Sequence, residues 1–241
     1  MEKITLSVGN QQISCTLFFP ENQKEKNPAV LFIPGWTSRE ENYRERAEKI
    51  AILGYVCLAI SLRGHGESDG TLKEFSRADH LEDVLRAYDF LAAQKNVDKN
   101  NISVVGASYG GYLAALLCNK RGVATVVLRA PALYINSEFS KPTAELISER
   151  EDEFFKNFIP EQNNKALLGV KKVPNRTLII ESEKDQIIPH NIIEYYLQAA
   201  DKKSVTHTII KNADHQLTDT KWRKEFIDIL ITWFKKNYPN H

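Results

Sequence analysis

A Gly-Ala-Ser-Tyr-Gly-Gly hexapeptide begins at Gly106 and directly follows the apolar run at 102–105. An apolar strand that enters Gly-x-Ser-x-Gly and passes at once into a helical pattern is the context of a nucleophile elbow, a sharp turn with the serine exposed at its tip. Only small residues fit beside such a serine, and Gly106 and Gly110 leave that room around Ser108. Tyr109 then begins the helix, so its backbone N–H has no helical partner and points toward whatever the serine attacks. The motif predicts a nucleophile and part of an oxyanion hole, although an ordinary Gly/Ser turn has the same composition.

Strand-like and helix-like segments alternate along the rest of the chain. Polar and apolar residues alternate on both sides of Gly9-Asn10, which predicts an antiparallel hairpin at the N-terminus. Apolar runs without alternation are expected in a parallel sheet that is covered on both faces, and they occur at 28–33, 55–60, 102–105, 124–128 and 177–180. Apolar stripes at helical spacing lie within 81–91 and 222–233. The pattern predicts one α/β domain over 1–241, with a mostly parallel, doubly wound sheet and the N-terminal hairpin.

The segment 131–173 interrupts this alternation, because it shows no strand pattern. A long insertion in a compact domain is often a functional lid, so we expect a cap here. Its aromatic residues either form the cap's own small core or line a substrate pocket, and they are Tyr134, Phe139, Phe154, Phe155 and Phe158. The charged run at 149–153 is interpreted as a solvated helix face.

Composition excludes several classes of partner. The chain has 241 residues, a net charge of +1 and interspersed charges, which is no electrostatic footprint for nucleic acid. Its three cysteines lie in apolar segments and indicate reduced core thiols. The N-terminus lacks a signal-peptide pattern, and no apolar stretch approaches the roughly 18 residues that cross a bilayer. We expect a cytoplasmic protein without a membrane partner.

A serine hydroxyl needs a histidine that takes its proton and a carboxylate that orients the histidine. After an elbow of this kind the chain order is serine, acid, histidine. Four histidines follow Ser108: His190, His207, His215 and His241. His241 is the last residue, His207 lies within a strand pattern at 205–210, and His190 opens a helix. His215 follows that strand in a loop, the position expected of a catalytic base.

The acid is expected after the apolar run at 177–180. Asp185 lies at the tip of the loop that follows and is favoured there, with Glu181 and Glu183 as alternatives. Asp214 precedes the histidine and is interpreted as a loop hydrogen-bonding residue.

A second oxyanion donor is expected from the loop after the run at 28–33. The backbone N–H of Trp36 is the natural partner of that of Tyr109, because Gly35 lets the backbone approach the substrate. Trp36 also fits as a wall of the pocket. In the Gly-rich loop at 61–68, Arg63 is interpreted as a structural anchor, and His65 precedes Ser108 and is not expected to be the base.

These motifs together resemble the α/β-hydrolase superfamily over nearly the whole chain, and within it the small cytoplasmic carboxylesterases of the feruloyl (cinnamoyl) type. The Ser-Tyr-Gly-Gly elbow is also similar to that of prolyl-oligopeptidase-type catalytic domains. Ser61 departs from the pattern, because many relatives have an aspartate there. The resemblance implies Ser108 as nucleophile, Asp185 as acid, His215 as base and the cap as a substrate-binding element. Trp36, Tyr134, Phe139 and Phe158 are the pocket residues expected on this basis.

The function predicted from the sequence is hydrolysis of small, medium or aromatic carboxylic esters by a carboxylesterase. The reaction would pass through an acyl-enzyme and needs no metal or organic cofactor. A peptidase or amidase and a thioesterase are alternatives on the same chemistry, and an inert binding protein is the alternative of another class. We expect a small-molecule ester as the substrate and a monomer or homodimer as the assembly.

Overall fold

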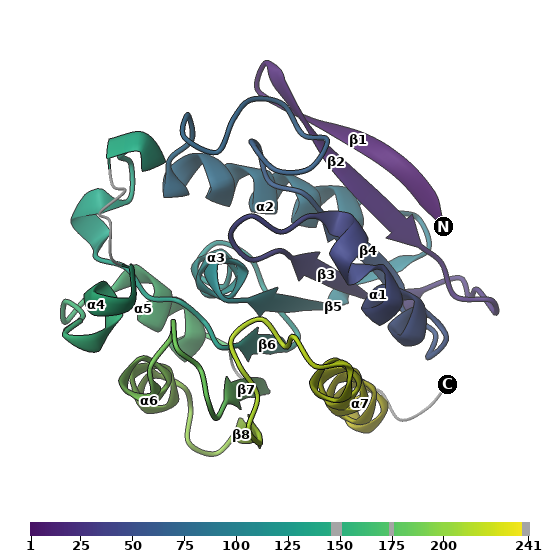
Figure 1. Ribbon diagram of the computed structural model, residues 1–241. Helices are drawn as coiled ribbons and strands as arrows, with labels where there is room; N and C mark the ends of the chain where they lie inside the picture. The colour runs from purple at the N-terminus through teal and green to yellow at the C-terminus, as the bar shows by residue number, and fades with distance from the viewer. Residues whose placement is uncertain (146–150, 174–175, 238–241) are drawn as a thin grey trace.

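The computed structural model describes residues 1–145, 151–173 and 176–237. Their strands form one eight-stranded sheet in the order β1-β2-β4-β3-β5-β6-β7-β8 (Figure 1). The strands are β1 (Glu2–Val8), β2 (Gln11–Phe18), β3 (Asn27–Ile33), β4 (Val56–Ile60), β5 (Val97–Ala107), β6 (Val126–Arg129), β7 (Thr177–Ser182) and β8 (Val205–Ile210).

The N-terminal hairpin is confirmed. β1 pairs with β2 in antiparallel register from Glu2 opposite Leu17 to Val8 opposite Gln11. Gly9 supports the tight turn with φ +57°, a conformation that glycine adopts without a steric penalty. β2 is antiparallel to β4, and all later neighbours are parallel. The sheet is therefore mostly parallel, as the uninterrupted apolar runs predict.

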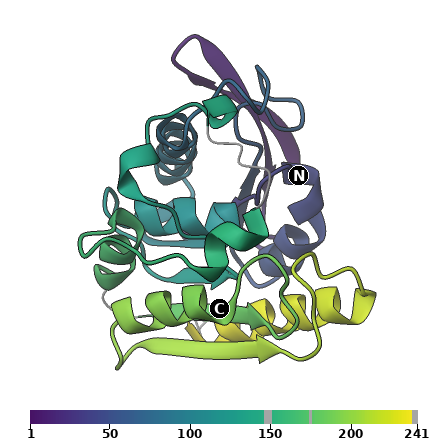
Figure 2. The same ribbon diagram turned by 60° about the vertical axis from the view of Figure 1, so that its left-hand side comes forward.

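Helices cover both faces of this sheet, with α1 and α7 on one face and α2, α3 and α6 on the other (Figures 1 and 2). The α-helices are α1 (Arg44–Ala51), α2 (Arg77–Ala92), α3 (Tyr109–Leu117), α4 (Glu151–Lys156), α5 (Lys165–Lys171), α6 (His190–Ala199) and α7 (Thr220–Asn237). Short 3-10 helices occur at η1 (Glu40–Tyr43), η2 (Asn136–Glu138) and η3 (Thr143–Glu145). The two helices predicted from apolar stripes are α2 and α7.

The core is divided by the sheet into two apolar clusters. Along β3, Leu31 and Ile33 belong to the cluster beneath α2 and α3, whereas Val30 and Phe32 belong to the one beneath α1 and α7. Successive side chains of a strand point to opposite faces, and here both faces are buried. A strand in this position needs apolar residues at every position, which is why β3 shows no alternation.

The segment between β6 and β7 carries η2, η3, α4 and α5, and its described part contains no strand. Phe155 and Phe158 are buried, at 2% and 5% exposure, in an aromatic cluster with Tyr134 and Phe154. The charged face predicted at 149–153 falls on side chains outside the described residues, as does His241. That the segment acts as a cap stays a prediction.

Two further expectations concern the whole chain. Cys15, Cys57 and Cys118 are buried and free of disulfides, as their apolar surroundings predict. Among the residues that the structure describes, no helix combines the length and the apolar content that crossing a membrane requires.

Candidate active site

Ser108 lies in the single-residue turn between β5 and α3 and has an unusual backbone conformation, with φ +52° and ψ −119°. The glycines around it have no room for a side chain. A Cβ on Gly106 would lie 2.2 Å from the carbonyl oxygen of Gly110, and a Cβ on Gly110 would lie 2.3 Å from that of Ile33. The sequence therefore permits a turn tight enough to present the serine at the carboxyl end of the sheet.

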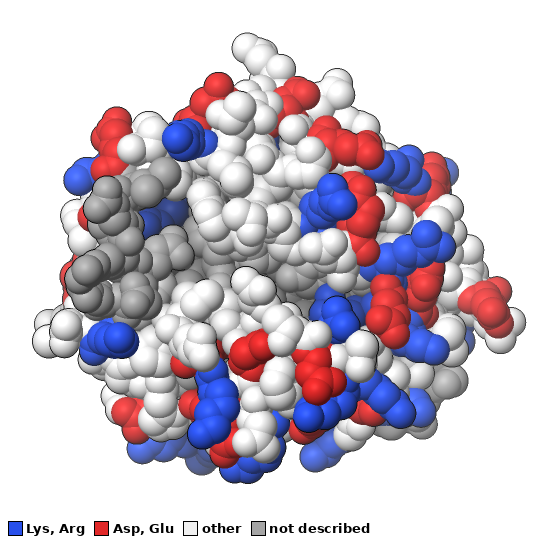
Figure 3. All heavy atoms as spheres, in the orientation of Figure 1, with Lys and Arg blue, Asp and Glu red and all other residues white. Residues whose placement is uncertain are grey.

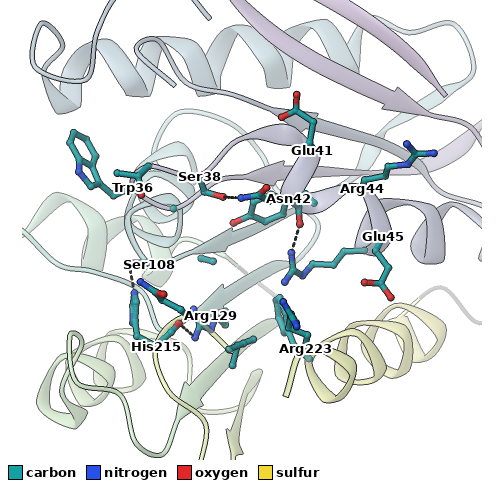
Figure 4. Close-up of a pocket in the computed structure, with 18 of the residues that line it drawn as sticks. Trp36, Ser38, Glu41, Asn42, Arg44, Glu45, Ser108, Arg129, His215 and Arg223 are labelled. Atoms are coloured by element: carbon teal, nitrogen blue, oxygen red, sulfur yellow. Dashed lines mark hydrogen bonds between the residues drawn. The ribbon is translucent and has the colours of Figure 1, made fainter. Parts of the chain in front are cut away.

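His215 and Asp185 reach this serine from the loops after β8 and β7. The Nε2 atom of His215 lies 3.0 Å from Ser108 Oγ (Figure 4). The Nδ1–H of the same ring donates to the Asp185 carboxylate, at 2.7 Å from Oδ2 and 2.9 Å from Oδ1. With Nδ1 protonated, Nε2 is free to accept the serine proton, which is the geometry of a nucleophile, a base and an orienting acid.

The Asp185 carboxylate is itself held by the loop that carries it. Its Oδ1 atom accepts hydrogen bonds from the backbone N–H groups of Ile187 (2.9 Å) and Ile188 (2.8 Å). The side chain is 4% exposed. These bonds fix the carboxylate against rotation, so His215 meets it in one orientation.

The two alternative acids bind elsewhere. Glu181 lies 2.8 Å from His190 Nδ1 and 2.9 Å from His207 Nε2, so it joins the two histidines that were set aside as bases. Glu183 accepts from Lys211 Nζ at 3.0 Å. Among the described residues, neither glutamate makes a hydrogen bond or ion pair with His215, which bonds to Asp185 instead. Asp214 accepts from the N–H of Thr218 at 3.0 Å, the loop hydrogen bonding expected of it.

Trp36 follows β3 in a turn beside the elbow. A Cβ on Gly35 would lie 3.2 Å from the carbonyl oxygen of Ala107, so the two loops approach at backbone distance. Within the described part of the chain, the backbone N–H groups of Trp36 and Tyr109 have no recorded acceptor. That they bind an oxyanion together stays a prediction.

Three loops beside the serine also contain non-glycine residues with left-handed backbone. They are Thr37 (φ 62°) after β3, Ala130 (φ 41°) after β6, and Asn212 (φ 57°) and Leu217 (φ 52°) after β8. L-residues rarely adopt this conformation, and such residues concentrate at functional sites.

A cavity of about 1150 Å³ opens onto Ser108 and His215. From Trp36 it extends past Ser108 toward α1 and the start of α7 (Figure 4). On this side of the molecule the central surface is mostly uncharged, while Lys and Arg gather with Asp and Glu over α1 and α7 (Figure 3). Of the expected pocket residues, Trp36 lines this cavity, whereas Tyr134, Phe139 and Phe158 are not among its lining residues.

Arg129 is a site residue that the sequence analysis did not identify. It ends β6, is 6% exposed and lines the cavity. Its Nη2 donates to Ser182 Oγ at 3.0 Å and to the backbone carbonyls of Asp214 and His215. Burial lowers the pKa of the guanidinium to about 10. This arginine therefore fixes the loop that carries His215 through hydrogen bonds to its backbone. Its only sequence signal is a charged residue at the end of an apolar run.

His80 is a second residue beside the site that no sequence motif indicates. The Tyr109 hydroxyl donates to His80 Nδ1 at 2.8 Å, and His80 Nε2–H donates to the Arg63 carbonyl at 3.1 Å. Arg63 is anchored in turn by Asp83, with Nε 2.6 Å from Oδ1, which agrees with its predicted structural role. The nearby His65 donates from Nδ1 to the same carbonyl at 3.0 Å. The first residue of α3 is thus tied to α2.

The sheet order, the elbow and the residues around it define a hydrolase of the α/β-hydrolase class. The chain belongs to the prolyl oligopeptidase family, whose family model matches residues 42–240. Among curated relatives, the human mitochondrial palmitoyl-protein thioesterase ABHD10 is 27% identical over 225 residues, which cover 81% of this chain and 69% of the relative. The hydrolyase poxO of Penicillium oxalicum is 35% identical over 112 residues, which cover 44% of this chain and 27% of that protein.

Solved structures share the fold at low sequence identity. Est1E from Butyrivibrio proteoclasticus with bound ferulic acid matches with a TM-score of 0.72 and 17% identity, and covers 97% of this chain and 96% of its own. The α/β hydrolase GrgF from Penicillium sp. sh18 matches with a TM-score of 0.73 and 17% identity, over 99% of both chains. Both confirm the fold expected from the resemblance.

Proposed function

We propose that this hydrolase cleaves carboxylic esters with small, medium or aromatic acyl groups through an acyl-enzyme formed on Ser108. The observation that carries the proposal is the continuous chain of contacts from Ser108 Oγ through the His215 ring to Asp185, at 3.0 Å and 2.7 Å. Two further observations support such a substrate: Trp36 lines the cavity, and the structural neighbour Est1E binds ferulic acid, an aromatic carboxylic acid.

In the first half of the reaction, Ser108 Oγ attacks the ester carbonyl carbon while His215 Nε2 takes the hydroxyl proton. The carbonyl oxygen becomes an oxyanion, which the N–H groups of Trp36 and Tyr109 would stabilise by about 3–4 kcal/mol each. Asp185 keeps Nδ1 protonated and stabilises the imidazolium. The histidine then protonates the departing alcohol as the carbon–oxygen bond breaks, which leaves an ester to the serine.

In the second half, a water molecule gives a proton to His215 Nε2 and attacks the acyl carbon. The bond to Ser108 Oγ breaks, the serine recovers its proton, and the carboxylic acid leaves. Every proton in both halves passes through the nitrogen that lies 3.0 Å from the serine oxygen.

Replacement Ser108→Ala tests the proposal. We expect turnover of p-nitrophenyl butyrate to fall roughly 10⁴-fold or more with unchanged folding, because the nucleophile is removed and the oxyanion donors remain. The matched control is Ser103→Ala, a buried serine on the same strand β5, which should keep its activity. A fluorophosphonate should label the wild-type protein and not the Ser108 variant. Substantial turnover by Ser108→Ala would contradict the proposal.

A thioester is the second candidate substrate, because the curated relative from Homo sapiens is named a palmitoyl-protein thioesterase. Membership in the prolyl oligopeptidase family also makes amides worth testing. An ester, a thioester and an anilide with the same acyl group separate the three cases. Amide cleavage at rates comparable to the ester would replace the esterase assignment by a peptidase, and a marked thioester preference would replace it by a thioesterase.

A further inference from the structure

The half of the cavity that lies away from Trp36 is lined by cationic side chains. From Ser108 and His215 the cavity continues to α1 and to the first turns of α7, where Figure 4 shows Arg44 and Arg223. Its basic lining residues are Arg44, Arg46, Arg129, Arg223 and Lys224. We call Arg46, Arg129 and Arg223 the arginine subsite.

The carboxylates of the cavity do not neutralise this subsite. Three glutamates line the cavity: Glu41, Glu45 and Glu48. Glu48 pairs with Arg44 at 2.8 Å, and Glu41 lies against Arg39 at 3.5 Å and Lys3 at 3.8 Å. Among the described residues, no carboxylate forms an ion pair with any arginine of the subsite. Glu45 favours the charged form of Arg46, and Asp185 and Asp214 favour that of Arg129, in each case without a direct ion pair in the described part of the chain.

Arg129 is buried and Arg46 is half-buried, and each has one donor atom without a partner among the described residues. The Nε atoms of Arg46 and Arg129 have no hydrogen-bond partner in the described structure. Arg129 uses Nη2 on backbone carbonyls and a hydroxyl, which are neutral acceptors. Arg46 donates through Nη1 to the carbonyl of Asn42 at 2.6 Å. Burial lowers the pKa of both arginines, because the charged form loses solvation.

The position of Arg46 is fixed before any ligand arrives. Its guanidinium lies over the rings of Tyr43 and Phe226, 5.3 Å and 5.2 Å from their centroids. A planar guanidinium held between two rings is preorganised for an anion, since little side-chain freedom remains to be lost on binding. A buried arginine without a direct ion pair, as at Arg129, is costly for a fold to maintain, and an anionic ligand would supply that contact.

We propose that the arginine subsite binds an anionic group of the substrate, a carboxylate or a phosphate. The inference rests on the proposed function, because it adds a substrate class to the same site. The anion is carried by either the acyl or the leaving group of the ester. Arg129 lines the cavity and contacts the His215 backbone, so the subsite begins directly beside the reacting atoms.

Two matched pairs of esters test this proposal and identify the group that carries the charge. 3-Butyryloxybenzoate and 3-butyryloxybenzamide differ only in charge on the leaving group, and p-nitrophenyl hydrogen adipate and its carboxamide analogue differ only on the acyl group. In at least one pair we expect the carboxylate to have at least about tenfold higher kcat/KM, as a charged hydrogen bond typically gives. Added salt should reduce the preference.

Arg223→Gln should reduce this preference, because it removes one of the three guanidinium groups that line the subsite. Arg46→Gln is the second variant, checked for folding by circular dichroism. Lys202→Gln is the control, because Lys202 is exposed and is not a lining residue. Equal kcat/KM within both pairs, or a preference that survives both arginine substitutions, would overturn the proposal.

Binding to the Ser108→Ala variant separates this proposal from the proposed function. Calorimetry with the same four esters measures affinity without turnover, and the carboxylate of the preferred pair should bind about tenfold more tightly. If wild-type protein cleaves no ester but the affinity difference is present, the esterase assignment fails and the anion subsite stands. If the wild-type protein cleaves the neutral esters but Ser108→Ala binds both members of each pair with equal affinity, the esterase assignment stands and the anion subsite fails.

Discussion

At the scale of single residues, the contact between Tyr109 and His80 gives α3 a fixed start. The carbonyl of Arg63 can only accept, so His80 Nε2 carries the proton and Nδ1 accepts from the Tyr109 hydroxyl. Burial, as the largest cause, lowers the pKa of His80 to about 3. The histidine is therefore neutral in the folded protein at any pH near 7, and its role is to position the residue whose N–H is proposed to bind the oxyanion.

This geometry predicts a pH dependence of stability. The folded pKa of His80 lies below its ordinary value of about 6.5, so its contribution to stability is present above pH 6.5 and is lost as pH falls toward 3. The slope cannot exceed about 1.4 kcal/mol per pH unit for one proton. His80→Gln should remove this part, so the difference in free energy of unfolding between wild type and variant, measured in urea from pH 7 to pH 4, should shrink as pH falls.

His190 provides the contrast of sign. Its hydrogen bond to Glu181 raises its pKa, so its contribution is present below pH 6.5 and is lost as pH rises through the folded value. The difference in free energy of unfolding between wild type and His190→Gln should therefore become smaller as pH rises. The effect should be small because the side chain is exposed.

For His80, a difference between wild type and His80→Gln that stays constant from pH 7 to pH 4 would contradict the assignment of a buried neutral imidazole.

Some residues of the site can be predicted from the sequence and others cannot. Ser108 and His215 are named by a local motif and by chain order, and the structure brings them together with Asp185. Arg129 and His80 carry no such signal, because their partners lie far along the chain and depend on how β6 and α2 pack. The expectation that Tyr134, Phe139 and Phe158 line a pocket could not be decided from composition, since aromatic residues serve cores and pockets alike.

At the scale of elements, the elbow depends on the absence of a side chain at one position. A Cβ atom at position 106 would lie 2.2 Å from the carbonyl oxygen of Gly110. That oxygen belongs to the backbone, so it cannot move aside as the end of a flexible side chain can. Gly106→Ala should therefore force β5 and α3 apart, with a loss of several degrees in Tm and at least about tenfold in kcat. Thermal unfolding and p-nitrophenyl butyrate turnover measure the two effects.

Gly122→Ala is the matched control for that substitution, because a Cβ at Gly122 meets nothing within 4 Å. Its Tm should stay the same or rise slightly, since alanine reduces the freedom of the unfolded chain. Equal effects of the two substitutions would show that crowding at the elbow is not what fixes it.

The apolar pattern of the sequence indicates the type of each element more closely than its boundaries. The apolar runs identify the central strands, but β5 begins at Val97, well before the apolar run at 102–105. Its register with β3 shifts between Asn27 and Ala29, so residues 98–101 extend the strand where pairing is irregular. Polar residues in such a stretch carry no periodic signal. The start of α2 was predictable, because Ser76 and Asp79 form a capping box.

At the scale of the whole molecule, the face with α1 and α7 depends on a small core. Phe234 is fully buried on α7, its ring lies 5.2 Å from that of Tyr55, and the Tyr55 hydroxyl donates to its carbonyl at 3.1 Å. Phe234→Ala should reduce the free energy of unfolding by about 3–5 kcal/mol in urea titrations. Ile52→Ala is the control, because Ile52 is 66% exposed and its truncation should cost less than about 0.5 kcal/mol. Similar losses in both variants would place the core elsewhere.

The left-handed backbone at Thr37, Ala130 and Leu217 has a consequence for how such a hydrolase adapts to heat. Each non-glycine residue in this conformation raises the energy of the folded state by about 1 kcal/mol, and all three lie in loops beside Ser108. At Thr37, which is exposed, glycine or asparagine would relieve that energy without repacking a core. Ala130 and Leu217 are buried, at 1% and 3% exposure, so the same change there would also remove core packing. A lineage under selection for thermal tolerance thus finds such a gain at position 37, in a loop beside the catalytic serine, where a more flexible backbone would also loosen the groups that must stay aimed at the substrate.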